Sequence, residues 1–353
     1  MKPRLLAIEL HHLGDAVMAI PFLHAAGERF TVGVFCTPPV AAMVQSFLPG
    51  IETFPAREGW TPRLLQAASA LKKWGPDVTV SAWSDARAHL VARLSGAGRR
   101  LGFPMNGINY YAPQIPWRKR RLAQGASLEQ FARTLGQPLL TEPLQRENAR
   151  ESHLANWQRL AAALELNLPL DPPWFDVSSL TPPENLPSFL EEQKRAGRPI
   201  WALHAGGRLA TKRWPLERFD QLLRDFFAPR NLPVLILGSP GEPTPSPASD
   251  LQRIWPCSSH RELAALINGA DALLCNDSYP AHLGAALGKR VYAIFGSGEP
   301  AWFSAHGNAH RVIRKSVCPH HPCIDRCVLP STICLEAVGV GDVAGFLERS
   351  EAP

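Results

Sequence analysis

ALLCNDSYPAHLGAALGKRVYAIFG, from Ala272 to Gly296, is the stretch that best defines the fold of this chain. Its first residues, Ala272–Cys275, form a short apolar run that predicts a buried strand, and Val291–Phe295 predict another. The residues between the two runs predict a polar turn, a helix and a terminating glycine. A strand, a helix and a second strand in this order are typical of a parallel α/β unit.

The polar turn Asn276–Ser278 lies where the first of these strands passes into the helix. The N-terminal end of a helix offers free N–H groups and the positive end of the helix dipole, and both favour an anion. His282 follows Ser278 by four residues, one helical turn, so it can face the same side. This arrangement predicts a site for a phosphorylated ligand.

The same alternation of short apolar strands and helices runs through most of the chain. Further strands are predicted at Arg4–Leu10, Thr31–Cys36, Asp77–Ala82, Arg100–Phe103, Ile200–His204 and Pro233–Gly238. Further helices are predicted at Asp15–Ala26, Val40–Phe47, Pro62–Trp74, Asp85–Leu94, Pro215–Phe227, Arg261–Asn268 and Gly341–Arg349. Such a pattern favours parallel sheets that are covered by helices on both faces.

The length of 353 residues exceeds that of one typical core and favours two domains. Residues 164–187 are rich in proline and have no sustained periodicity, so we interpret them as the connection. The expected boundaries are 1–168 for a first Rossmann-like domain and 188–335 for a second, with a last helix in 336–353. The two doubly wound domains are expected to face a cleft.

The composition is that of an ordinary soluble protein, with 45% hydrophobic and 19% charged residues and a net charge of +6. No apolar run reaches the ~18–20 residues that span a bilayer. The early run Leu5–Leu10 is interrupted by Glu9, which is not typical of a signal peptide. We therefore expect a cytoplasmic protein. The run Trp117–Arg121 is either a solvated loop or a contact with anionic groups such as phosphorylated lipid headgroups.

Asp15 follows the first predicted strand, in the segment His12-Leu13-Gly14-Asp15. Ligands of open α/β sheets gather at the carboxyl ends of strands, so Asp15 could act as a general base there. Alternatively, it caps the helix that begins at this point. His12 and its neighbour His11 could line the same site or be polar loop residues.

A second polar segment precedes the helix at Pro215. Gly206 and Gly207 allow a ligand to approach the backbone closely, and Lys212 and Arg213 place cations beside a helix end that is already positive. The cations are explained by an anion between them, or they belong to a basic surface turn. Glu242 follows another strand and is either a partner for ribose hydroxyls or a surface residue.

Four segments, in order, resemble glycosyltransferase family 9, the lipopolysaccharide heptosyltransferases. They are LGDAVMAIP (13–21), HAGGRLATKRWPLERF (204–219), NDSYPAHLGAALGKRVYAIFG (276–296) and CPHHPCIDRCVLPSTICLEAV (318–338), with a looser match over Lys73–Phe103. The resemblance implies a GT-B fold. It also implies that the first domain binds the acceptor, that the second binds the nucleotide sugar, and that the last helix packs on the first domain.

The implied reaction is an inverting transfer of a sugar, typically heptose from ADP-heptose, to a hydroxyl of a lipopolysaccharide core. Two alternatives remain open: another GT-B enzyme, such as a sugar-nucleotide epimerase, and a non-catalytic relative that binds a nucleotide. The expected partners are a nucleotide-sugar donor and a lipid-linked glycan acceptor at the inner membrane, and no nucleic acid.

The resemblance assigns a role to individual residues. Asp15 matches the base, and the residues matched to the donor site are Thr211, Lys212, Glu242, Asp277, Ser278, Tyr279 and His282. Tyr279 stands where the family has glycine, so we expect it to reshape the pocket. Acceptor contacts are expected from His12, Gly14, Arg118, Lys119 and Arg120. Because a lysine and a helix dipole can replace a divalent metal, we expect catalysis without a cofactor.

The four late cysteines are Cys318, Cys323, Cys327 and Cys334. Four thiolates could hold Zn or Fe tetrahedrally and fasten a loop that lacks a core. The spacing lacks paired C-x2-C units, and reduced thiols or a local disulfide are the alternatives.

Overall fold

The computed structural model describes residues 2–56, 62–105, 139–148, 150–324 and 326–351. The predicted acceptor contacts Arg118, Lys119 and Arg120 lie outside these residues. The chain divides into two compact units, Met1–Leu170 and Asp171–Pro353, and each is described by itself.

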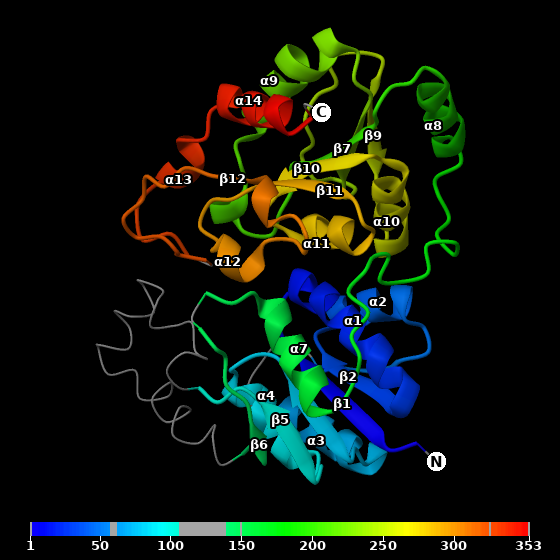
Figure 1. Ribbon diagram of the computed structural model, residues 1–353, viewed down its shortest axis with the longest axis vertical. Coiled ribbons are helices and arrows are strands. Elements are labelled where there is room, and N and C mark those ends of the chain that lie inside the picture. Colours follow the sequence, from blue (N-terminus) through cyan, green and yellow to red (C-terminus); the bar gives the residue numbers. More distant parts are fainter. Residues whose placement is uncertain (1, 57–61, 106–138, 149, 325, 352–353) are drawn as a thin grey trace. The chain divides into compact units, whose positions relative to one another are not determined.

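The first unit is built on a parallel sheet with the strand order β3-β2-β1-β4-β5-β6 (Figure 1). Its strands are β1 (Arg4–Glu9), β2 (Thr31–Cys36), β3 (Glu52–Pro55), β4 (Val78–Ser81), β5 (Arg99–Gly102) and β6 (Glu142–Pro143). Five of the six residues in β1 and in β2 are buried, because the sheet is covered on both faces.

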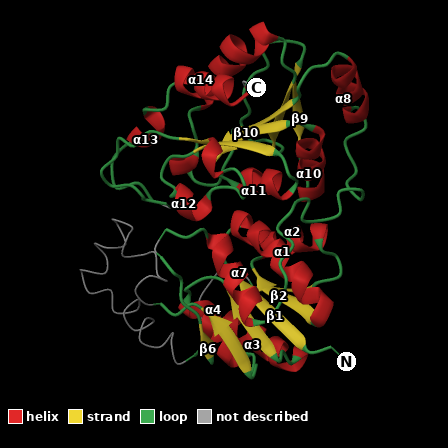
Figure 2. Ribbon diagram, in the orientation of Figure 1, coloured by secondary structure: helices red, strands yellow, loops and turns green. Residues whose placement is uncertain are grey.

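Helices cover this sheet (Figure 2). They are α1 (Leu13–Arg29), α2 (Pro38–Phe47), α3 (Pro62–Trp74), α4 (Ala86–Leu94) and α7 (His153–Ala163). Helix α1 contacts α2 and α7, and α3 contacts α4. The Phe22 and Trp157 rings of α1 and α7 lie 5.1 Å apart between centroids. On the side of α3 and α4, Leu71 and Val91 pack against Leu6 of the central strand.

The second unit repeats the plan with the order β12-β11-β10-β7-β8-β9. Its strands are β7 (Trp201–His204), β8 (Val234–Gly238), β9 (Gln252–Pro256), β10 (Ala272–Asn276), β11 (Arg290–Ile294) and β12 (Val312–Ile313), all parallel. The stretch 272–296 therefore forms β10, a helix and β11, as its pattern predicts.

The helices of the second unit include three short 3-10 turns and one π-helical turn. They are α8 (Leu186–Arg195), η3 (Ala210–Lys212), α9 (Leu216–Leu222), η4 (Leu223–Phe227, the π turn), η5 (Ala228–Arg230), α10 (His260–Gly269), α11 (Tyr279–Ala286), α12 (Pro300–Phe303), η6 (Ala309–Arg311), α13 (Ile333–Glu336) and α14 (Val340–Glu351). Its core contains Trp201, Trp214 and Tyr292.

Two expectations about this unit need correction. The last helix, α14, contacts α9, and its Val343 and Leu347 lie in the second core, so it is part of the second unit. The second unit also begins before residue 188. Trp174 is buried, and its N–H donates to the Ala286 carbonyl at 2.8 Å.

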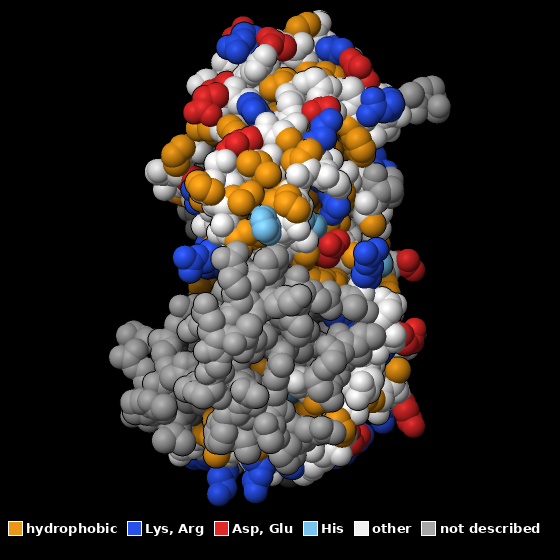
Figure 3. Space-filling model, turned by 90° about the vertical axis from the view of Figure 1, so that its left-hand side faces the viewer, with side chains coloured by type: hydrophobic (Ala, Val, Ile, Leu, Met, Phe, Trp, Pro, Cys, Tyr) orange, Lys and Arg blue, Asp and Glu red, His pale blue; other side chains and the backbone are white. Residues whose placement is uncertain are grey.

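None of the described helices is both long and apolar enough to span a bilayer. On the face seen in Figure 3, the described Lys and Arg side chains are interspersed with Asp and Glu and with hydrophobic side chains. The described part of this face therefore shows no single basic field.

Candidate functional site

Asn276, the last residue of β10, ties three segments together at the carboxyl edge of the second sheet. The side chain is fully buried. Its Oδ1 accepts from the Trp214 N–H at 3.0 Å, and its Nδ2 donates to the carbonyls of Ala205 (2.6 Å) and Gly206 (3.1 Å). The glycine turn after β7 and the segment before α9 are thus fixed beside the start of α11. All three are segments that the sequence predicted to bind a ligand.

Lys212 lies against this edge. Its Nζ is 2.8 Å from Oδ2 of Asp277, whose side chain is only 3% exposed. A Cβ at Gly298 would overlap the same carboxylate oxygen, so a larger residue there would have to displace the Asp277 carboxylate. The structure therefore brings together Lys212 and Asp277, two residues that the resemblance matches to the donor site, and Asp277 holds the lysine at the turn.

His282 and Ser278 lie on the same helix start. Ser278 is the N-cap of α11, and its Oγ donates to the Asn276 carbonyl at 3.1 Å. Burial lowers the pKa of His282 to about 4; the charge of Asp277 raises it and that of Lys212 lowers it. His282 is therefore a neutral hydrogen-bonding group at neutral pH, close to the Lys212–Asp277 pair.

Glu242 follows β8, and its side chain lies against the same glycine turn. A Cβ on Gly206 would lie 2.8 Å from the Glu242 carboxyl carbon and from His204 Cε1, so a larger residue there would have to displace these side chains. A Cβ on the next residue, Gly207, would lie 3.9 Å from that of Ser278. The glycine turn thus runs between Glu242 and Ser278. The segments that carry this turn, Lys212, Glu242 and Ser278 therefore line one edge of the second sheet.

The cysteine-rich segment packs behind Thr211. The Thr211 carbonyl accepts from the Ser297 N–H at 3.4 Å, and its hydroxyl donates to the Ile324 carbonyl at 3.5 Å. The Ser297 hydroxyl donates to the same carbonyl at 2.9 Å. The segment after β11 therefore supports η3, which carries Lys212.

The cysteines of this segment are free thiols, so a local disulfide is not formed. Burial raises the pKa of Cys323 and of Cys334, and the charges of the neighbouring cysteines, including Cys318 and Cys327, raise them further. The Cys323 thiol donates to the His320 carbonyl at 3.1 Å. Within the described residues, no group of three His, Cys, Asp or Glu side chains could hold a metal ion. This geometry does not assemble the four-thiolate site.

At the carboxyl edge of the first sheet, Asp15 is buried, with 6% of its surface exposed. Its Oδ2 accepts from the His12 N–H at 3.2 Å, so it caps α1 from the third helical position. Gly14 is buried and His12 is exposed. Asp15 therefore caps α1, which was one of its two interpretations. Its role as a general base remains a proposal.

A charged cluster that the sequence did not predict lies at the same edge as Asp15. His11 Nε2 lies 3.2 Å from Asp85 Oδ2, and Arg87 Nη2 lies 2.6 Å from the same atom. Asp85 also caps α4 by accepting from the Arg87 N–H at 2.8 Å. Burial raises the pKa of Asp85, but the hydrogen bonds and charges of His11 and Arg87 hold it well below its ordinary range. Asp85 follows a predicted strand, as Asp15 does, and this signal could have identified it.

Glu9, the last residue of β1, is a second missed carboxyl group. Its side chain is 2% exposed, and Oε1 accepts from the His11 N–H at 3.0 Å. Burial raises its pKa well above the ordinary value, and the charges of Asp15 and Asp85 raise it further. Glu9 therefore keeps its proton to a higher pH than an exposed glutamate.

This raised pKa of Glu9 makes stability depend on pH. The unfolded chain releases the proton near pH 4.3, whereas the folded chain still holds it, so stability falls as pH rises from there through the folded pKa. Each unit of difference is worth about 1.4 kcal/mol. We expect Glu9→Gln to flatten this fall, because glutamine keeps the acceptor for His11 and has no proton to lose. Urea unfolding of both proteins between pH 5 and pH 9 tests this; parallel curves would contradict it.

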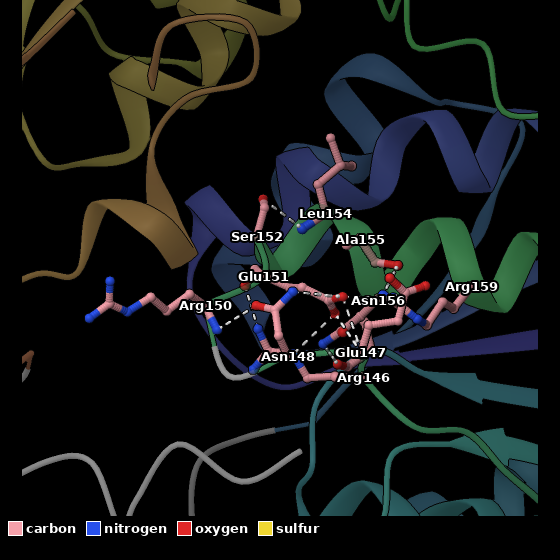
Figure 4. Close-up of polar contacts among 11 residues, drawn as sticks. Arg146, Glu147, Asn148, Arg150, Glu151, Ser152, Leu154, Ala155, Asn156 and Arg159 are labelled. Atoms are coloured by element: carbon pink, nitrogen blue, oxygen red, sulfur yellow. Dashed lines mark hydrogen bonds and ion pairs between the residues drawn. The ribbon is translucent and has the colours of Figure 1, made fainter. Parts of the chain in front are cut away.

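A polar network fixes the start of α7 (Figure 4). The Glu151 carboxylate lies 2.8 Å from Arg159 Nη2 and 3.8 Å from the buried Arg146 Nε. The Ser152 hydroxyl caps the helix by accepting from the Leu154 N–H at 3.3 Å. These contacts join the segment before α7 to its first two turns.

The same helix start supports an aromatic stack at the carboxyl edge of the first sheet. Asn156 Nδ2 donates to the Ala82 carbonyl, just after β4, at 2.8 Å. The rings of His153 and Trp83 lie 4.3 Å apart, and Trp83 lies 4.3 Å from the ring of His11. The His11 ring therefore packs against the Trp83 ring on one side, and the Nε2 atom of His11 contacts Asp85.

Comparison with known proteins identifies the family and the fold of the chain. The sequence profile of Glycosyltransferase family 9 (heptosyltransferase) matches residues 123–331, more than half of the chain. No curated protein sequence matches. Among solved structures, E. coli ADP-heptose lps heptosyltransferase II is similar, with 19% identity, a TM-score of 0.61 and coverage of 100% of both chains.

Two further structures share the fold. E. coli heptosyltransferase WaaC with ADP has 15% identity and a TM-score of 0.64, over 98% of this chain and 99% of that one. The family 9 glycosyl transferase from Veillonella parvula DSM 2008 has the same identity and score, over 99% and 97%. These similarities confirm the predicted GT-B fold.

Proposed function

Because this chain belongs to glycosyltransferase family 9, we propose that it transfers a heptose from ADP-heptose to a hydroxyl of a lipopolysaccharide-core acceptor, with inversion at the transferred carbon. The observation that carries the proposal is the Lys212–Asp277 pair, held 2.8 Å apart at the start of α11. A cation beside a helix N-terminus is suited to a diphosphate.

In this proposal the second unit binds the donor. Lys212 and the N-terminal end of α11 stabilise the negative charge that develops on the departing diphosphate. Thr211, Ser278 and neutral His282 provide hydrogen bonds beside it, and Glu242 accepts from ribose hydroxyls. Since fixed charges and dipoles supply the electrostatic stabilisation, we propose that the reaction needs no cofactor.

The first unit supplies the acceptor side. Asp15 removes the proton from the acceptor hydroxyl while its oxygen attacks the anomeric carbon. The bond from that carbon to the diphosphate oxygen breaks, and the nucleoside diphosphate leaves with the electron pair. Gly14 and His12 lie beside Asp15 in the sequence and would border the acceptor. The acceptor is lipid-linked, so we place the enzyme at the cytoplasmic face of the inner membrane, with Arg118, Lys119 and Arg120 as its contacts.

A panel of nucleotides tests the donor assignment. We expect ADP and ADP-heptose to raise the unfolding temperature more than GDP or UDP, because binding to the folded state alone adds stability. A ligand at 100 times its Kd adds about 2.7 kcal/mol. AMP, which lacks the β-phosphate, is the matched control and should have a much smaller effect. If no nucleoside diphosphate changes the unfolding temperature, the proposal is wrong.

A further inference from the structure

Tyr279 occupies the first position of α11, directly after the Asp277–Ser278 turn. Its ring meets the ring of His260 edge to face, with 5.5 Å between centroids and 83° between planes. His260 is the first residue of α10. The two rings therefore join the starts of two helices that follow β9 and β10 at the carboxyl edge of the second sheet.

The hydroxyl of Tyr279 has an unusual environment. Its oxygen is buried and has no hydrogen-bond partner among the residues that the structure describes. A buried tyrosine hydroxyl normally finds a partner, and leaving one without a partner costs free energy. Burial also raises the pKa of this phenol well above its ordinary value, so the group keeps its proton and remains a donor. A buried donor without a partner, beside a ligand-binding turn, is explained by a partner on the ligand.

Its surroundings indicate which part of the ligand this is. Lys212 and the turn at Asp277 carry the charge features suited to a diphosphate. The Tyr279 ring instead lies against His260, at the start of α10, the helix that follows β9. Beyond the diphosphate, a nucleotide offers neutral acceptors on its ribose and base, and aromatic rings suit a flat base.

We propose that Tyr279 binds the nucleoside part of the donor: its hydroxyl donates to a ribose or base acceptor, and its ring, backed by His260, forms the adjoining wall. This inference rests on the proposed function and adds a specificity-determining residue to it. It also gives a reason for a bulky side chain at a position where the family has glycine.

The test is Tyr279→Phe, which removes only the hydroxyl. We expect the Kd for ADP to rise roughly three- to tenfold, the worth of one neutral hydrogen bond. The unfolding midpoint of the ligand-free protein should not fall, because the hydroxyl has no partner there to lose. Inorganic pyrophosphate, measured by competition with ADP, should bind as it does to the unchanged protein. Tyr292→Phe, in the core strand β11, is the matched control and should leave the Kd for ADP unchanged.

Each contrary result has a distinct meaning. If Tyr279→Phe binds ADP like the unchanged protein, or loses stability without ligand, the inference is wrong. If ADP and pyrophosphate are weakened equally, the hydroxyl contacts the diphosphate and the nucleoside assignment is overturned. If the unchanged protein binds neither ADP, GDP nor UDP, the proposed function fails and this inference fails with it.

Discussion

Lys212→Met should reduce heptose transfer at least ~100-fold and raise the Kd for ADP by a similar factor, because a charge-assisted contact with the diphosphate is lost. The variant should also lose stability, by up to about 3 kcal/mol, because Asp277 is almost fully buried and would have no cation beside it. Isothermal titration with ADP and urea unfolding measure the two effects separately.

A double variant separates binding from folding. Lys212→Met combined with Asp277→Asn removes both charges, so much of the stability should return while ADP binding stays weak. Lys315→Met is the control: it breaks an exposed ion pair of 2.6 Å with Asp342 and should change stability by less than about 1 kcal/mol. An unchanged Kd for ADP in Lys212→Met would remove the lysine from the donor site.

The strands that the sequence predicted differ in kind from those that it missed. The predicted strands occupy the central positions of the two sheets, whereas the missed ones are β3, β6, β9 and β12, which form the four edges. A central parallel strand is buried on both faces and appears as an apolar run. An edge strand has one neighbour and more solvent: β3 has no buried residue, and β9 has only one, Gln252. No apolar run exists there to be recognised.

The helices α7 and α8 were also missed, for different reasons. Helix α7 carries Leu154, Trp157 and Leu160 at helical spacing, and all three are buried, so the signal was present. Helix α8 buries only Leu186, Phe189 and Gln193, and it begins inside the segment interpreted as a connection. For α14, the pattern indicated a helix, but an amphipathic face does not specify which core it covers.

The parts of the candidate site that lie within one sequence motif could be predicted from the sequence. Asp277, Ser278 and His282 share one turn and one helix, and strand-end reasoning places them correctly. The contacts that complete the site are distant in sequence: Asn276 accepts from the Trp214 N–H, 62 residues away. Only the folded sheet brings such strand ends to one edge, and the same holds for the contact between His11 and Asp85.

Asp15→Asn should reduce transfer by about 100- to 10,000-fold, the contribution of a positioned general base, while the Kd for ADP stays within about twofold. Asparagine keeps an oxygen that can accept from the His12 N–H, so the helix cap is retained and stability should change little. Asp15→Ala removes the cap as well and should cost about 1 kcal/mol more. Transfer to a heptose-free core acceptor, followed by mass spectrometry, measures the activity.

The chain itself contains a matched control for Asp15. Asp342 occupies the third position of α14 after a glycine, in Val340-Gly341-Asp342, and accepts from the Gly339 N–H at 2.9 Å. Leu13-Gly14-Asp15 has the same arrangement and the same kind of cap at the start of α1, near the other end of the chain. Asp342→Asn should therefore leave transfer unchanged. Because both substitutions alter a cap in the same way, activity lost only in Asp15→Asn is due to the carboxylate. Full activity in Asp15→Asn would mean that Asp15 serves α1 alone and that another group takes the proton.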